Sequence, residues 1–157
     1  MSSKLLNCRM ELAALFNDMP FAKLLGIRVT EVDEGYAEAE LPFNDDLRSH
    51  TWGSVAHGAA TYALADTVAG AAVISLSQDV SPTVDMRIDY LAPATSDLNA
   101  QAEVIRFGSS LAMTYVEVFD ADDTRIATAQ GTYKTGGQGK QTPWNDRQEN
   151  GVDEDAE

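Results

Sequence analysis

A long uncharged segment in the middle of the chain constrains the fold more than any other feature. Between His57 and Asp79 the sequence runs GAATYALADTVAGAAVISLSQ, and Asp66 is its only Asp, Glu, Lys, Arg or His. The small and apolar residues predict a buried helix that is apolar on nearly every face, and such a helix needs cover on nearly every side. A curved sheet wrapped around the helix would provide that cover.

Asp66 is the first functional candidate in this helix. A carboxylate in an apolar helix loses its hydration unless it is paired or hydrogen-bonded, and a simple core position would hold Ala or Leu instead. Buried acids with perturbed pKa values are enriched at functional sites. The alternative is structural: Asp66 caps a local break near Gly70, or it points into solvent where the helix is only partly covered.

Alternating apolar and polar residues predict the strands around this helix. Ile27 to Val32 and Tyr36 to Leu41 form a hairpin about a turn at 33–35, and Val84 to Tyr90 alternate as a half-buried strand would. Three further strands are expected at about 98–107, 111–119 and 125–134. The short turns between these three predict antiparallel neighbours.

The length of 157 residues is that of one ordinary domain. We expect a single domain over 1–135, with a helical flank at 1–24 that breaks at Pro20, and a disordered tail at 136–157. The tail holds six acids and two bases among Gly, Gln and Asn. The predicted helices and antiparallel strands together make the expected fold class α+β.

The net charge of −14 argues against binding to nucleic acid or to an anionic membrane. A salty environment and a simply acidic protein explain this charge equally well. The single Cys8 excludes an intramolecular disulfide and a multi-cysteine metal site. The N-terminus lacks the long apolar run of a signal peptide, and the central Asp66 argues against a membrane span, so we expect a cytoplasmic protein.

Several common chemistries have no motif in this chain. It has no glycine-rich phosphate loop, no G-x-S-x-G elbow, and no His, Cys and Asp set at metal-ligand spacing. We therefore expect neither a metal nor a cofactor.

Four stretches match the pattern of one known family: FAKLLGIRVTEVDEGYAEAEL, HGAATYALADT, VDMRIDYLAPA and TRIATAQGTYK. Over roughly 20–135 the chain resembles hotdog-fold thioesterases of the phenylacetate-degradation (PaaI-like) group. The helix motif of that family is His-Gly-Gly followed by small or apolar residues and an acid. Here it reads His57-Gly58-Ala59 with Asp66 seven residues later, so the spacing is kept and the second Gly is lost. The resemblance implies a hotdog fold, a curved antiparallel sheet around one long helix.

The resemblance implies that Asp66 acts as general base or nucleophile on a thioester carbonyl, and both roles stay open. Gly58 stands where the helix begins, so its N–H has no partner within the helix and lies at the positive end of the dipole. A donor in this position suits a developing oxyanion.

The residues before the helix leave alternatives open. His57 precedes Asp66 by nine residues, about 900° of helical rotation, which argues against a direct pair and leaves His57 either a backbone-bonded structural residue or part of the site. The family usually has an Asn shortly before the His-Gly pair. Alignment on Gly53, itself a candidate binding residue, puts His50 in the Asn position, whereas alignment on His57 puts Thr51 there.

The family also takes a Ser or Thr from the next strand, donated across a dimer interface, and Thr83 matches that place. The alternative for Thr83 is structural, as a β-branched residue that favours the start of a strand. Tyr62 is expected to line the acyl pocket. For the coenzyme A nucleotide, the resemblance points to a basic and small polar turn whose members are Arg106, Gly108, Ser109 and Ser110. The alternative for the arginine is a solvated charge on a strand.

We interpret the chain as an acyl-CoA thioesterase that hydrolyses a small or aromatic acyl-CoA, with acyl identity undetermined. A hotdog sheet leaves an edge exposed, so a homodimer is the minimum and a homotetramer is expected. The partners would be the acyl-CoA and further copies, with no nucleic acid or membrane. The alternatives are a non-catalytic acyl-CoA-binding hotdog module and a hotdog dehydratase or hydratase, whose usual His-Pro-Gly helix entry is absent.

Overall fold

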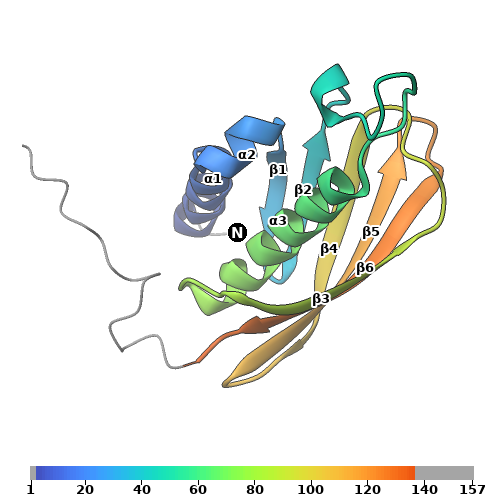
Figure 1. Ribbon diagram of the computed structural model, residues 1–157. Helices are drawn as coiled ribbons and strands as arrows, with labels where there is room; N and C mark the ends of the chain where they lie inside the picture. Colours follow the sequence, from blue (N-terminus) through green and yellow to red (C-terminus); the bar gives the residue numbers. More distant parts are fainter. Residues whose placement is uncertain (1–2, 137–157) are drawn as a thin grey trace, which may run out of the picture.

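The computed structural model describes residues 3–136 (Figure 1). Its elements, in chain order, are α1 (Ser3–Asn17), α2 (Pro20–Leu25), β1 (Arg28–Asp33), β2 (Tyr36–Leu41), a 3-10 turn η1 (Asp45–Leu47), α3 (Gly58–Ser77), β3 (Thr83–Tyr90), β4 (Leu98–Phe107), β5 (Leu111–Asp120) and β6 (Arg125–Lys134). The predicted tail at 136–157 lies outside the described residues, Gly136 excepted.

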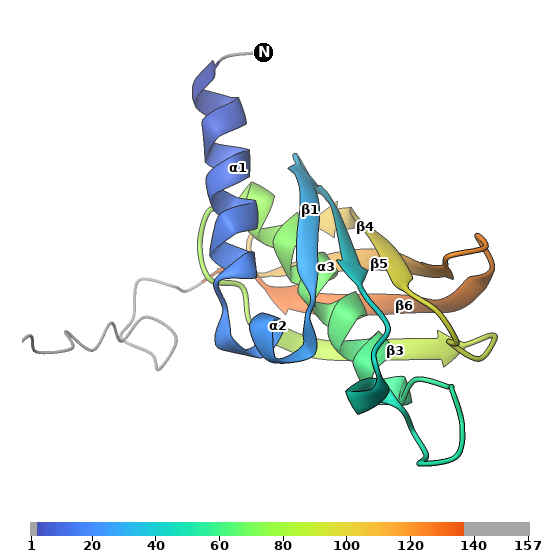
Figure 2. The same cartoon turned by 90° about the horizontal axis from the view of Figure 1, so that it is seen from above.

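The six strands form one antiparallel sheet in the order β1-β2-β4-β5-β6-β3. The sheet curves, and α3 lies in its hollow, as Figures 1 and 2 show from two directions. This is the hotdog architecture, so the predicted α+β class and the predicted adjacency of β4, β5 and β6 are confirmed. The two strands that flank α3 in the sequence, β2 and β3, lie four places apart in the sheet.

Small residues on the inner face of the sheet let α3 approach closely. Strand β2 buries every second residue, Ala37, Ala39 and Leu41, and β4 does the same with Leu98, Ala100 and Ala102. Half of the residues of α3 are buried against them and their neighbours. By length and apolar composition α3 could also cross a membrane, but 56% of that window is buried inside the fold, as in a core helix.

The N-terminal flank forms two helices that cover the β1 edge of the sheet. Pro20 lies in the first turn of α2, where its missing N–H costs nothing, and the chain leaves α2 through Gly26 at φ 81°. Asn17 then bonds to both backbone groups of Val29, donating to its carbonyl at 3.0 Å and accepting from its N–H at 2.7 Å. Leu15 of α1 stays 62% exposed.

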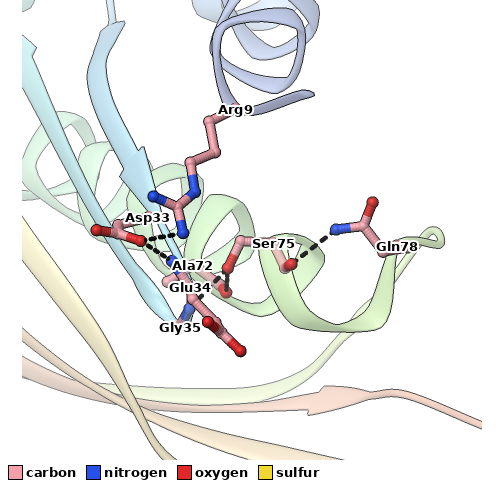
Figure 3. Close-up of polar contacts among 7 residues, drawn as sticks. All are labelled: Arg9, Asp33, Glu34, Gly35, Ala72, Ser75 and Gln78. Atoms are coloured by element: carbon pink, nitrogen blue, oxygen red, sulfur yellow. Dashed lines mark hydrogen bonds and ion pairs between the residues drawn. The ribbon is translucent and has the colours of Figure 1, made fainter. Parts of the chain in front are cut away.

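Polar contacts tie the C-terminal end of α3 to the first hairpin (Figure 3). The Gly35 N–H donates to Ser75 Oγ at 2.8 Å, and Arg9 of α1 pairs with Asp33 at 2.6 Å. Gln78 ends the helix in the left-handed region and donates to the Ser75 carbonyl at 2.7 Å. These bonds fix the hairpin against both helices.

Strand β3 differs from its prediction as a half-buried strand. Met86 is buried, whereas Val84 and Tyr90 are 60% and 51% exposed. The reason is its position, because β3 is the last strand of the sheet and bonds only to β6. Its other edge is not covered by any part of the chain that the structure describes.

Candidate functional site

The carboxylate of Asp66 points from α3 toward strands β3 and β6. Its Oδ1 accepts hydrogen bonds from the Thr83 hydroxyl at 2.9 Å and from the Tyr133 phenol at 2.8 Å. Helix α3 continues unbroken past Gly70, so Asp66 caps no break there. The arrangement is that of a carboxylate held in place by two hydroxyl donors.

The contact between Thr83 and Asp66 forms within one chain. The pairing of β3 with β6 brings them together, because Thr83 lies opposite Tyr133 in the register and both stand beside α3. The implied donation of Thr83 across a dimer interface stays a prediction, in which Thr83 and Asp66 would come from the same copy.

Tyr133 belongs to this cluster and was not predicted from the sequence. Only 1% of Tyr133 is exposed, and burial together with the negative charge of Asp66 raises the pKa of its phenol. The phenol therefore stays protonated and donates at neutral pH. The alternation of β6 indicates that position 133 faces inward, but that pattern does not reveal which helical residue it meets.

Near the start of α3, Gly58 presents an unpaired N–H. The His57 side chain accepts from the Ala59 N–H through Nδ1 at 3.0 Å, and its carbonyl accepts from the Ala60 N–H at 2.9 Å. Among the described residues no acceptor faces the Gly58 N–H. His57 therefore acts as the N-cap, the structural role considered for it, and the Gly58 N–H is the first-turn donor left for a ligand.

Tyr90 packs directly over Gly58. Its phenol donates to the Gly58 carbonyl at 2.7 Å, and a Cβ on Gly58 would lie 3.1 Å from Tyr90 Cζ. The same residues border a cavity of about 390 Å³, which Thr61 and Ile126 also line. Glycine at this position therefore allows the Tyr90 ring to pack closely against the start of α3.

Within one chain, Gly58 and Asp66 cannot act on the same small group. They are eight residues apart on one helix, which separates them by about 12 Å along its axis. The structure thus divides the predicted catalytic residues into a donor at the helix start and a carboxylate in the helix middle.

The loop before α3 carries the candidates for the Asn position. The His50 ring stacks on Trp52, with ring centroids 5.0 Å apart and planes 7° from parallel. His50 and Thr51 are both exposed, and Gly53 is half-buried. Neither side chain contacts Asp66 in the chain as described, so the choice between His50 and Thr51 stays open.

Tyr62 lies one helical turn before Asp66. Its phenol donates to the Met86 carbonyl at 3.0 Å. Burial raises the pKa of this phenol, and the charges of Asp66 and Asp85 raise it further. Tyr62 is therefore near the carboxylate without bonding to it.

The residues predicted for the coenzyme A nucleotide do come together. Arg106, Gly108, Ser109 and Ser110 line one cavity of about 370 Å³ at the β4–β5 turn. No ion pair engages Arg106 among the described residues, whereas Arg87 pairs with Asp89 at 2.9 Å. Within the same residues no group of three His, Cys, Asp or Glu side chains could hold a metal ion.

Comparison with known proteins agrees with the resemblance to thioesterases that the sequence motifs indicated. The family model described as the thioesterase superfamily matches residues 53–127. A protein of Halobacterium salinarum, provisionally named an esterase, is 31% identical over 75% of this chain and 85% of its own length. The medium/long-chain acyl-CoA thioesterase YigI of Salmonella typhimurium is 28% identical over 75% of this chain and 86% of its own.

A solved structure extends the likeness to three dimensions. The PaaI protein of the Escherichia coli phenylacetic acid degradation operon superposes with a TM-score of 0.72 at 25% identity, covering 79% of this chain and 89% of that one.

Proposed function

The chain belongs to the thioesterase superfamily, and from this premise we propose that it hydrolyses acyl-CoA thioesters with Asp66 as the reacting carboxylate and the Gly58 N–H as oxyanion donor. The observation that carries the proposal is the Asp66 carboxylate, held on one oxygen by Thr83 and Tyr133. A fixed carboxylate beside solvent is suited to activate water or to attack a carbonyl.

Two routes fit this geometry. As general base, Asp66 takes a proton from water, the resulting hydroxide attacks the carbonyl carbon, and coenzyme A leaves as its thiolate. As nucleophile, the carboxylate oxygen bonds to the carbonyl carbon and expels the thiolate, and water then hydrolyses the mixed anhydride. In both routes the Gly58 N–H stabilises the negative charge that develops on the carbonyl oxygen.

The proposed site combines two chains. The separation of Gly58 and Asp66 along α3, about 12 Å, requires that the donor and the carboxylate at one thioester come from different copies. The outer edge of β3, which no described part of the chain covers, offers a surface for a second copy. We propose a homodimer as the minimum unit and a homotetramer as the full assembly.

The substrate class is proposed as small or aromatic acyl-CoA. The cavity at Arg106, with Ser109 and Ser110, supports binding of the coenzyme A nucleotide there, because it combines small polar groups with a cation that no described residue pairs in an ion pair. Gly53 and Tyr62 are proposed to contact the rest of the substrate. We further propose that the domain spans 1–135, acts in the cytoplasm and needs neither a cofactor nor a metal.

One specific feature favours a second candidate function. Ala59 stands where the family has its second glycine, and His50 or Thr51 stands where it has asparagine. A hotdog module that binds acyl-CoA without turning it over would tolerate both changes. Dehydration of an acyl-CoA is the further alternative, and it would release no thiol.

The test is thiol release from acetyl-, hexanoyl-, palmitoyl-, benzoyl- and phenylacetyl-CoA by the parent and by Asp66→Asn. We expect the parent to turn over at least one of them and the variant to lose at least about 100-fold in kcat. The variant should still bind acyl-CoA in a calorimetric titration. Equal rates in both proteins would remove Asp66 from the mechanism, and binding without release by the parent would favour the module.

A further inference from the structure

The geometry around Asp66 points to Tyr133 as a positioning residue that fixes which carboxylate oxygen reacts. We propose that Tyr133, together with Thr83, anchors Asp66 Oδ1 and leaves Oδ2 as the oxygen that meets water or the thioester. This inference rests on the proposed function of Asp66. It adds a role for a residue that never needs to touch the substrate.

The first step is the distribution of bonds on the carboxylate. Both donors reach Oδ1, from Thr83 at 2.9 Å and from Tyr133 at 2.8 Å, and the Tyr133 phenol also lies 3.1 Å from the Asp66 carbonyl. No described group donates to Oδ2. Since no buried side-chain oxygen in the described residues lacks a partner, Oδ2 is open to solvent.

The second step is the way the fold holds the Tyr133 ring. A Cβ on Gly131 would lie 2.8 Å from Tyr133 Cε2, 2.9 Å from Met86 Cε and 2.9 Å from Thr114 Oγ1. On the helix side, Gly70 faces the same ring at ordinary contact distance. The ring thus lies in a slot with little freedom, which fixes the position of its hydroxyl beside Asp66.

The third step is that the neighbouring phenol does not take the place of Tyr133. Tyr62, one turn earlier on α3, donates to the Met86 carbonyl at 3.0 Å, so it does not replace Tyr133 as a donor to Asp66.

The experiment removes only the hydroxyl, with Tyr133→Phe. Its matched control is Tyr36→Phe, because Tyr36 also donates to a carboxylate, that of Glu38 at 2.5 Å, but on β2, four places away from β3 in the sheet. We expect Tyr133→Phe to lower kcat about tenfold with little change in KM. Tyr36→Phe should keep the kcat and KM of the parent.

A second readout needs no activity. In protein labelled with ¹³C at the aspartate carboxyl carbons, the Asp66 signal is the one missing from Asp66→Asn. Its chemical shift at neutral pH should change in Tyr133→Phe, which removes a hydrogen bond from the carboxylate, and stay unchanged in Tyr36→Phe. A purely structural role for Tyr133 would lower the melting temperature and leave this chemical shift in place.

The outcomes separate the two proposals. If Asp66→Asn is inactive while Tyr133→Phe changes neither kcat nor the chemical shift of the Asp66 signal, the positioning role is overturned and the thioesterase proposal stands. If Asp66→Asn is as active as the parent, the proposed function of Asp66 fails, and the positioning role with it. A shift in both readouts supports the inference.

Discussion

At the scale of single residues, the proposed role of the Gly58 N–H as oxyanion donor can be tested with proline, which has no backbone N–H. Proline is well tolerated in the first position of a helix, and His57 already has the extended backbone that a residue before proline prefers, at φ −63° and ψ 136°. Gly58→Pro therefore removes the N–H while the helix can still form.

We expect Gly58→Pro to lower kcat by about 100-fold or more. Gly58→Ala is the control, because it adds the same Cβ against Tyr90 and retains the N–H. It should lose far less activity in the same thiol-release assay. Equal losses in the two variants would show that the contact with Tyr90, and not the N–H, limits the reaction.

Tyr133 also predicts a stability effect at high pH. Burial raises the pKa of its phenol above the unfolded value of about 10, so the folded state favours the neutral form. The stability from this group is complete below that pH and is lost as pH rises toward the folded value. In urea unfolding between pH 8 and 11, the free energy of unfolding should fall less steeply with pH in Tyr133→Phe than in the parent. An equal fall in the two proteins would show that Tyr133 does not contribute to the pH dependence.

At the scale of elements, the start of α3 depends on the His57 side chain as N-cap. His57→Ala should lower the free energy of unfolding by about 1 kcal/mol, whereas His57→Asn, which can cap, should lose little. Both variants should turn over substrate at rates within a few fold of the parent. A large loss of kcat in His57→Asn, with normal urea unfolding, would instead give His57 a catalytic role.

The exposed edge of β3 carries a prediction on assembly. Val84→Lys places a charge on that edge, so it should shift the protein toward the monomer in light scattering and reduce turnover with it. The control is Met10→Lys on α1, where an equally exposed apolar side chain lies near the opposite edge of the sheet. Retention of the dimer in Val84→Lys would move the interface elsewhere.

Most elements were predictable because their patterns are local. Strands β4 and β6 have the predicted bounds of 98–107 and 125–134, and the helix around Asp66 follows from one uncharged segment. Contacts between distant elements were not predictable. Alternation places Tyr133 on an inner face and Thr83 at a strand start, but only the pairing of β3 with β6 brings both to Asp66.

At the scale of the whole molecule, the proposed division of the site between two chains predicts complementation. Gly58→Pro and Asp66→Asn should each be inactive alone. In a heterodimer of the two, one site carries both changes and the other carries neither, so about half of the parent activity should return. Co-expression with two different tags and sequential purification gives this species. If the heterodimer stays inactive, donor and carboxylate do not come from different chains.

The slot around the Tyr133 ring links two positions of the last strand in any future change of sequence. Because a Cβ at 131 would overlap the ring at 133, a library that randomises position 131 alone should return almost only glycine among folded members. Larger residues at 131 should be recovered only together with a smaller one at 133, which would also release the Asp66 carboxylate. Sequence change at position 131 is thereby coupled to the way in which the Asp66 carboxylate of α3 is held.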